Sequence, residues 1–507
     1  MKNIKRILAL LLALIMIGSC FVACGDPVET PDDNDSNTDD GDEEGDDGTE
    51  EGDDTVVEQI KPDIPETYNF NEEEISFLYW YVEAWVDTVR YCRDIYFESP
   101  LGEPIPDKVY YRNAEIEERY NVNITLEMSR YDQIGTVITG QNATGDNAYL
   151  ITVPRLLEQA KMVTSGAFQN LYDVEHIDLD KPWWDQDSIA QLSSNGTLNL
   201  VGTSLMVNDK DATAALAFNK DAAADKSLGS LYTYLDDNEW TYETLISIAE
   251  DVNEDANGDE KMDMEDFWGF LGKNDVMTSF FHGSGGQFVT KDPDADEFVF
   301  SFGTENDINA TMDLLDYVFA ADWFFNHHME GIDDTAYTKM FESGHGLFFW
   351  MRLDEVTNMR GSATNFGILP IPKYTEEQEN YHATVSQHTT GLLSIPMSTT
   401  GEDLSMVGMI LEALSAHSHY NLQPEYVEVS LKTRYARDDE SEASLDIILN
   451  SRVFDPGVIF GFGSFADDYQ SMYAGGHRNI SSFVEERQSS TEEAIAEFND
   501  TIFENAN

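Results

Sequence analysis

The alternation of strand-like and helix-like segments in residues 74–154 constrains the fold of this chain most. The segment EISFLYWYV (74–82) is an apolar run of β-forming residues, as in a buried strand. RNAEIEERY (112–120) has an amphipathic helical pattern, and VNITLEM (122–128) alternates like a strand. NAYLITVP (147–154) predicts another strand. Strand, helix and strand at this spacing predict a parallel sheet with crossover helices, and therefore an α/β fold.

Later segments continue the same pattern. Four apolar runs predict further strands: ALAFNK (215–220), HGLFFWM (345–351), FGILPIP (366–372) and GLLSIPM (391–397). Residues 403–418 and 490–505 predict helices, and Ser490 with the residues after it supplies a helix-start signal for the second. The roughly 440 residues from Tyr68 onward contain no internal repeat, so we expect two lobes.

The first 23 residues predict a secretory signal. Lys2, Lys5 and Arg6 form a positive segment, and the apolar residues from Ile7 to Ile17 follow. Eleven residues span only about half of a bilayer core, so this segment is a poor permanent membrane helix. A short apolar segment behind a positive start is typical of a signal peptide.

The end of this signal resembles a bacterial lipobox. Val22 and Ala23 precede Cys24, and Gly25 follows. In that resemblance the cysteine becomes the first mature residue and carries a diacylglyceryl group, whose two acyl chains suffice for stable anchoring. Cys20 is the alternative lipidation site, and an ordinary signal with incidental cysteines is the simpler alternative. If Cys24 is lipidated, only Cys92 remains, so the mature fold has no disulfide.

Residues 24–67 predict an acidic disordered linker. Between Asp26 and Asp54 there are 16 Asp or Glu residues and no Lys or Arg. Such a segment repels itself and cannot bury a core, so we interpret it as a spacer rather than as a calcium-chelating tail. The whole chain has a net charge of −68, which excludes nucleic acid as a partner.

Several segments of the globular region resemble, in order, one known family. They are RNAEIEERYNV (112–122), GDNAYLI (145–151), AFNKD (217–221), WTYETLISIAEDV (240–252), FESGHGLFFWM (341–351) and FGILPIPK (366–373). Together with the lipobox and the spacer, they resemble the extracellular solute-binding lipoproteins of bacterial ABC importers, of the family 1 type that includes maltose- and oligosaccharide-binding proteins. The resemblance covers residues 70–507, and no single motif in it is diagnostic.

This resemblance implies a two-lobed α/β fold of the periplasmic-binding-protein type II, or Venus-flytrap, kind. We expect lobe 1 in residues 68–212 plus 344–398, and lobe 2 in residues 213–343 plus 399–507. The implied function is capture of a carbohydrate, expected to be an oligosaccharide, between the lobes and its delivery to ABC permease subunits. The protein is then a monomer that is not an enzyme, held by its lipid at the extracellular face of the cytoplasmic membrane.

Ligands of open α/β sheets bind beyond the carboxyl ends of the strands. Aromatic side chains can stack on sugar rings there, while charged groups bond to hydroxyls. The candidates after the predicted strands and on the KPWWD loop are Trp80, Glu83, Trp85, Asp87, Trp183, Trp184, Trp350 and Arg352. The alternative for each tryptophan is a core position, and we expect one of Trp183 and Trp184 to pack beneath the other.

The segment DANGDEKMDMED (255–266) has nearly the oxygen spacing of an EF-hand calcium loop. The candidate ligands are Asp255, Asn257, Asp259, the Lys261 carbonyl, Asp263 and Asp266. Glu260 occupies the sixth position, where the EF-hand has glycine, and Asp266 replaces the bidentate glutamate. We therefore expect at most a weak, structural calcium site, with an acidic surface turn as the alternative and no required cofactor.

Two other functions stay open at this stage. One is a cell-surface glycan-active enzyme or lectin-like module, which would need a carboxylate pair at a fixed separation. The other is a binder of peptide or another small solute, which a cleft lined by arginine would favour. The sequence contains no nucleophile motif with a matching base, so neither alternative has a signal of its own.

Overall fold

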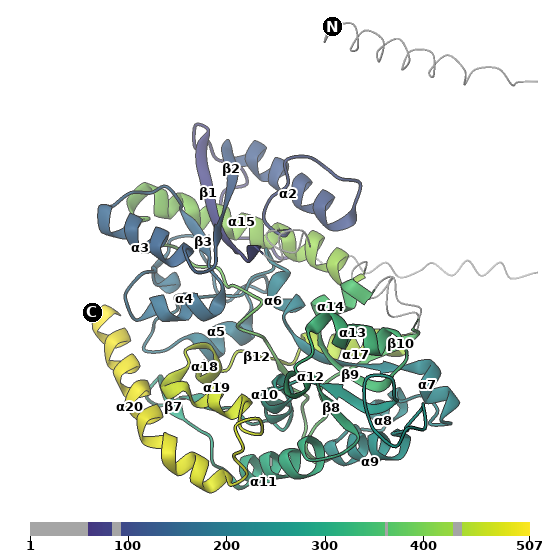
Figure 1. The fold of residues 1–507 in the computed structure, drawn as a ribbon. Coiled ribbons are helices and arrows are strands. Elements are labelled where there is room, and N and C mark those ends of the chain that lie inside the picture. Colours follow the sequence, from purple (N-terminus) through teal and green to yellow (C-terminus); the bar gives the residue numbers. More distant parts are fainter. Residues whose placement is uncertain (1–58, 84–92, 360–363, 429–438, 507) are drawn as a thin grey trace, which may run out of the picture. The chain divides into compact units, whose positions relative to one another are not determined.

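The computed structural model describes residues 59–83, 93–359, 364–428 and 439–506. The predicted signal, Cys24 and the acidic linker up to residue 58 lie outside this range, as do Trp85 and Asp87. From Gln59 onward the chain forms one compact unit. Two separate β-sheets, each accompanied by helices, organise this unit (Figure 1).

The first sheet has the strand order β2-β1-β3. Its strands are β1 (Glu73–Tyr81), β2 (Val122–Arg130) and β3 (Ile151–Val153). All pairs are parallel, with Phe77 opposite both Leu126 and Ile151. The helix α2 (Pro104–Tyr120) connects β1 to β2, as the sequence pattern predicted, and it ends at Asn121 in the left-handed conformation. The predicted parallel sheet with crossover helices is therefore confirmed for this part of the chain.

The second sheet is mixed and has the strand order β10-β4-β9-β5-β8. Its strands are β4 (Ala214–Asn219), β5 (Trp268–Gly272), β8 (Phe324–Asn326), β9 (Gly346–Arg352) and β10 (Phe366–Leu369). β4 runs antiparallel to β9 and β10, whereas β5 runs parallel to β8 and β9. All residues of β4 and β5 are buried, which explains their near-continuous apolar sequences.

The sheet pairing differs from the expected lobe boundaries. We assigned residues 344–398 to the lobe of the first sheet, but β9 and β10 pair with β4 and β5 in the second sheet. Conversely, α15 (Gly401–Glu425), expected with the second lobe, packs against α2 beside the first sheet. The apolar pattern correctly located these elements but contains no information about which neighbour each one pairs with.

The remaining elements surround these sheets. Shorter strands are β6 (Val289–Asp292), β7 (Glu297–Phe300), β11 (Ala383–Thr384) and β12 (Arg452–Val453). Helices before β9 are α3 (Ile134–Thr144), α4 (Leu156–Val163), α5 (Gln186–Leu192), α6 (Asn208–Asp211), α7 (Lys220–Asp225), α8 (Tyr232–Asp236), α9 (Tyr242–Val252), α10 (Asp275–Gly283), α11 (Glu305–Asp313), α12 (His327–Glu330) and α13 (Asp334–Glu342). Later helices are α14 (Leu353–Asn358), α17 (Asp439–Leu449), α18 (Pro456–Ile459), α19 (Phe465–Gln470) and α20 (Ile480–Ala506).

The chain passes between the two sheets at several segments, of which the first two lie side by side. The first passage leads from α6 into β4, and there Thr213 forms a β-bridge with Val385. The second passage leads from β11 to residues 391–396, where Ser394 bridges Thr152 of β3. The third passage lies between α15 and α17. The helix α15 contacts α2 beside the first sheet, whereas α17 contacts β10 of the second sheet. We call the elements around the first sheet the first half; it includes α5, residues 391–396 and α15. The elements around the second sheet, including α17, form the second half.

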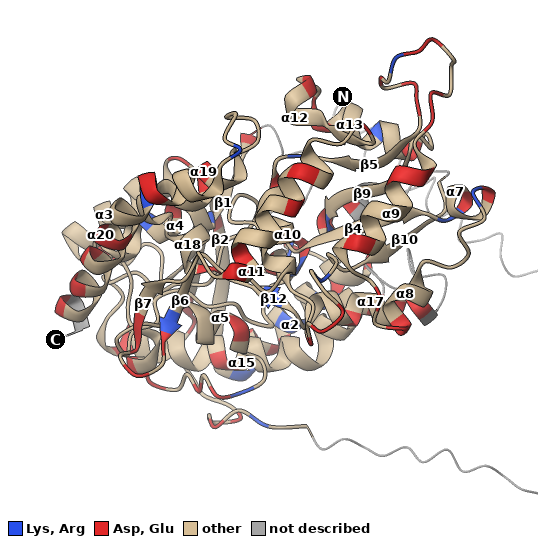
Figure 2. Ribbon diagram, turned by 90° about the horizontal axis from the view of Figure 1, so that it is seen from below, with Lys and Arg blue, Asp and Glu red and all other residues tan. Residues whose placement is uncertain are grey.

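Acidic residues are distributed over the helices of this unit, with few basic residues between them (Figure 2). Within the ranges that the structure describes, no helix has the length and apolar character needed to cross a membrane.

Candidate functional site

The site forms around His388, which lies in the second passage between the sheets. Charged groups of both halves act on its imidazole. Arg155 and Glu158 come from the start of α4, directly after β3, while Asp275 begins α10 after β5, and Asp467 lies on α19. Burial lowers the pKa of His388, so its imidazole is neutral at neutral pH. The carboxyl ends of strands from both sheets therefore contribute to one region.

The first half contributes the charged residue Arg155 and the aromatic residue Tyr131. The guanidinium carbon of Arg155 lies 4.1 Å from the ring centroid of Tyr131, which follows β2. The same guanidinium forms two hydrogen bonds to Glu158, with Nε 2.6 Å from Oε2 and Nη2 2.5 Å from Oε1. The backbone N–H of Tyr131 donates to the carbonyl of Tyr81 over 2.9 Å, which fixes this residue beside the end of β1. These contacts orient Arg155 over the aromatic face.

The second half contributes Trp350, which is only 2% exposed. Its indole Nε1 donates to Ser279 Oγ over 3.1 Å, and Lys273 Nζ lies 4.7 Å from the ring centroid. A small cavity of about 30 Å³ borders this residue, together with Asp275, Arg352 and residues 384–388. This volume admits about one or two water molecules, and it is too small for a sugar ring.

Arg352 ends β9 at the same cavity. Its Nε lies 3.2 Å from Asp354 Oδ1, and its Nη2 lies 3.2 Å from Glu355 Oε1. Burial alone would lower the pKa of Arg352, but these carboxylates and that of Asp275 outweigh it and raise the pKa. Arg352 therefore stays charged, with its charge compensated within the second half.

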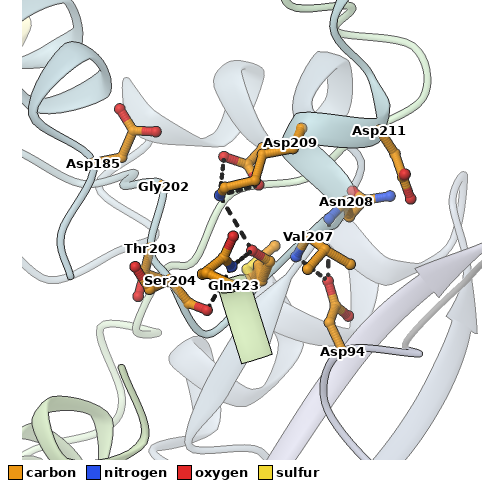
Figure 3. Close-up of polar contacts among 12 residues, drawn as sticks. Asp94, Asp185, Gly202, Thr203, Ser204, Val207, Asn208, Asp209, Asp211 and Gln423 are labelled. Atoms are coloured by element: carbon orange, nitrogen blue, oxygen red, sulfur yellow. Dashed lines mark hydrogen bonds and ion pairs between the residues drawn. The ribbon is translucent and has the colours of Figure 1, made fainter. Parts of the chain in front are cut away.

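A buried ionic network surrounds α6, and Figure 3 shows its carboxylates Asp94, Asp185, Asp209 and Asp211. Arg452 Nη1 lies 2.6 Å from Asp209 Oδ2, and the same guanidinium pairs with Asp185, the N-cap of α5. Lys210 Nζ lies 3.3 Å from Asp209 Oδ1. Asp209 is fully buried, so its charge is compensated by protein groups rather than by water.

A second part of this network surrounds Asp211 at the end of α6. Asp211 pairs with Arg93 and accepts a hydrogen bond of 2.8 Å from the Tyr426 hydroxyl, just past α15. Asp94 Oδ2 accepts the backbone N–H groups of Val207 and Asn208 (Figure 3). The network thus joins α6, at the first passage, to elements of both halves.

The other predicted ligand residues have different surroundings. Trp80 is fully buried in the first sheet, Glu83 is exposed, and Trp85 and Asp87 lie outside the described residues. Trp183 and Trp184 are both buried, and the indole Nε1 of Trp184 donates to Glu412 Oε2 over 2.9 Å. The surfaces of Trp80, Trp183 and Trp184 are occupied by protein in this form of the molecule.

Sequence reasoning missed Tyr131, Arg155, Asp275 and His388. The signal for the first three was present, because each follows a strand by one to three residues. The same rule that selected Trp350 and Arg352, applied to β2, β3 and β5, would have identified them. His388 has no such signal, because it follows β11, a two-residue strand that is not part of either main sheet.

Carboxylates of the 255–266 loop accept hydrogen bonds from the loop's own backbone N–H groups. Glu260 adopts φ 65°, the left-handed conformation of the sixth EF-hand position. Asp255 Oδ2 accepts the Glu260 N–H over 2.8 Å, and Asp259 Oδ1 accepts the Lys261 N–H over 2.9 Å. Asp266 is fully buried and accepts the N–H groups of Ala256 and Asp263. In the described part of the chain, no group of three or more His, Cys, Asp or Glu side chains is arranged to hold a metal ion.

Comparison with known proteins identifies the fold. No protein-family model and no curated protein matches the sequence. Solved structures do match. The ABC substrate-binding protein Lmo0181 from Listeria monocytogenes, in complex with cycloalternan, matches with 11% identity and a TM-score of 0.50, over 86% of this chain and 99% of its own. The chain has the two-lobed type II periplasmic-binding-protein fold.

Two further solved structures share this fold. A cyclo/maltodextrin-binding protein complexed with maltotetraose matches with 11% identity and a TM-score of 0.52, over 85% of this chain and 97% of its own. UspC from M. tuberculosis matches with 15% identity and a TM-score of 0.53, over 83% of this chain and 100% of its own. The fold class predicted from the sequence is confirmed, and at these identities the likeness concerns the fold.

Proposed function

We propose that this protein is the lipid-anchored substrate-binding component of an ABC importer and captures a carbohydrate, expected to be an oligosaccharide, between its two halves. The observation that carries the proposal is the convergence of both halves on His388: Trp350 borders the same cavity as His388, and Tyr131 contacts Arg155, whose charge acts on His388. Tyr131 lies in the first half and Trp350 in the second. A ligand held between them gains contacts only when the halves approach, which is the requirement for ligand-driven closure.

The chemistry of the site supports a polyhydroxylated ligand. Arg155 with Glu158 and Arg352 with Asp354 form compensated ion pairs, so the site offers hydrogen-bond donors and acceptors without a strong net charge for an anion. Two structures with the same fold contain cycloalternan and maltotetraose, both of them oligosaccharides. The cavity of about 30 Å³ implies that the halves separate to admit such a ligand.

In this proposal the protein binds and releases its ligand unchanged, and permease subunits receive it from the closed form. The lipid on Cys24 holds the protein at the outer face of the cytoplasmic membrane, and the acidic residues up to 67 act as the spacer. The alternatives of a glycan-active enzyme and of a binder for peptides or other small solutes become outcomes of the test.

The test is a thermal-shift screen of the purified mature protein against maltotetraose, cycloalternan, a peptide mixture and monosaccharides. We expect a stabilising shift with an oligosaccharide and its recovery intact after incubation. Cleavage of the oligosaccharide would replace the proposal with an enzyme, and a shift with peptides alone would replace the ligand class.

Separately, we propose that the 255–266 loop binds calcium weakly, and that the bound calcium has a structural role, stabilising the second half. The hydrogen bonds within the loop and the conformation of Glu260 support an EF-hand-like backbone. The short Asp266 at the twelfth position limits the affinity, which is expected near the millimolar range of extracellular sites.

A further inference from the structure

A second and larger cavity lies next to the passages between the halves. Its volume is about 690 Å³, within the range of small-molecule sites. None of its lining residues borders the cavity at Trp350. Its walls come from four places: Asp187 and Gln191 on α5, residues 285–287 after α10, residues 379–382, and residues 447–453 around the end of α17 and β12.

These walls belong to both halves. The segment that contains α5 is joined to the first half, because Trp184 bridges Thr203 and Val201 bridges Leu393. The helix α17 packs on β10 in the second half. Across the cavity, Gln287 Nε2 donates to Gln191 Oε1 over 3.1 Å. A molecule in this cavity would therefore contact both halves at once.

Several polar side chains of the cavity have no protein partner. Among the residues that the structure describes, the carboxylates of Asp187 and Glu379 accept no hydrogen bond and form no ion pair, and the side chains of Asn380, His382 and Asn450 are also unbonded. Arg452, the basic residue of the wall, is already committed to Asp185 and Asp209. Glu379, Asn380 and Asn450 are exposed, whereas Asp187 is partly buried and the charge of Arg452 only partly offsets its own. The cavity thus offers several acceptors and an excess of negative charge.

We propose that this cavity is a second binding site, for a small organic cation that carries several N–H donors, of the aliphatic polyamine class. Asp187 and Glu379 pair with its ammonium groups, and the amide oxygens of Asn380 and Asn450 accept further N–H groups. The chain's net charge of −68 raises the local concentration of cations, whereas it disfavours anions.

The electrostatics of Asp187 agree with a cationic occupant. Burial and the neighbouring Asp185 raise the pKa of Asp187, and the charge of Arg452 only partly opposes them. A bound ammonium group would supply the missing positive charge and favour the ionised carboxylate.

A cation bound here also biases the relative position of the halves, because Asp187 and Glu379 lie on different sides of the passages. This consequence rests on the proposed function, since only a protein that opens and closes would transmit it to the site at Trp350. By linkage, the polyamine and the cleft ligand would then alter each other's affinity by the same factor.

The experiment measures spermidine binding to the mature chain by calorimetry in about 150 mM NaCl, where screening weakens general attraction to acidic surfaces. The test variant is D187N/E379Q. The matched control is D236N/E493Q, which removes the same charge from two exposed carboxylates outside the cavity. Circular dichroism and melting temperature verify that both variants fold.

We expect the cavity variant to weaken spermidine binding at least about tenfold, and the control to stay within about twofold of the wild type. Equal weakening in both variants, or no change in the cavity variant, would overturn the proposal. Binding of trehalose that the cavity variant abolishes, without spermidine binding, would replace the cation by a neutral polyol. Oligosaccharide binding is measured on the same variants, so loss of the proposed function is distinguished from loss of this site.

Discussion

The guanidinium of Arg452 and the carboxylate of Asp209 form a buried ion pair, with Nη1 2.6 Å from Oδ2. Arg452 follows α17, which packs in the second half, whereas Asp209 lies on α6 at the first passage between the sheets. Because the same guanidinium also binds Asp185, the N-cap of α5, one side chain near the C-terminal end connects two segments that lie at least 243 positions earlier.

We predict that Arg452→Ala lowers the free energy of unfolding by about 3–5 kcal/mol, because it leaves Asp185 buried without its counter-charge and leaves Asp209 with Lys210 alone. Urea unfolding followed by circular dichroism measures this loss. Arg130→Ala is the control, since Arg130 pairs with Asp132 at an exposed site, and its loss should lower the stability much less. Equal losses of stability in both variants would show that burial of the Arg452 pair does not increase the cost of removing it.

The second prediction concerns the pH dependence of stability at Glu412. Burial raises the pKa of Glu412 to about 7, from 4.5 for the free side chain. The folded state therefore holds a proton that the unfolded state releases, so its contribution to stability falls as the pH rises through this interval and stays low above it. Glu412→Gln should remove this term, and its stability relative to the wild type should rise by up to roughly 3 kcal/mol between about pH 5 and about pH 8. Denaturant titrations across this range measure the difference, and a pH-independent difference would contradict the buried, protonated carboxyl.

The third prediction tests the anchor. Expressed in a bacterium with its full signal, the protein should incorporate radiolabelled palmitate and fractionate with membranes, and Cys24→Ala should abolish both. Cys20→Ala is the matched control, because that position is removed with the signal if Cys24 is modified. Labelling that survives Cys24→Ala and disappears in Cys20→Ala would move the lipid to Cys20.

The fourth prediction concerns the 255–266 loop. With a millimolar site, about 10 mM calcium should raise the melting temperature by about 2 °C over that in EDTA. Asp266→Asn should abolish this increment, because Asp266 occupies the twelfth loop position, whereas Glu265→Gln, at an exposed neighbour, should retain it. Identical melting temperatures of the wild type in EDTA and in calcium would leave the loop as an acidic turn.

Much of the fold could be predicted from the sequence because apolar runs and helical periodicity depend only on residues that are close together in the chain. The runs at 74–82 and 345–351 correspond to β1 and β9 within a residue or two. Pairing partners could not be predicted in the same way. β9 lies between β4 and β5, and nothing in its seven residues indicates pairing with these strands rather than with the first sheet.

The site was predicted less completely for a related reason. A tryptophan in a loop pattern has the same sequence signal whether it faces a cleft or the core. Trp184 is buried because its indole meets Glu412, a residue 228 positions later on α15. Such long-range partners decide exposure, and they are set by packing rather than by the residues nearby in sequence.

Calorimetric titration of the mature protein with the oligosaccharide that gives the largest thermal shift tests the central claim most directly. We predict saturable binding without turnover, weakened at least about tenfold (about 1.4 kcal/mol) by Trp350→Ala and less by Trp350→Phe, which keeps an aromatic face. Tyr111→Ala, at an exposed aromatic on α2, should leave the affinity unchanged. Binding that is equally strong in wild type and Trp350→Ala would remove Trp350 from the site, and the absence of binding to any oligosaccharide would contradict the proposed function.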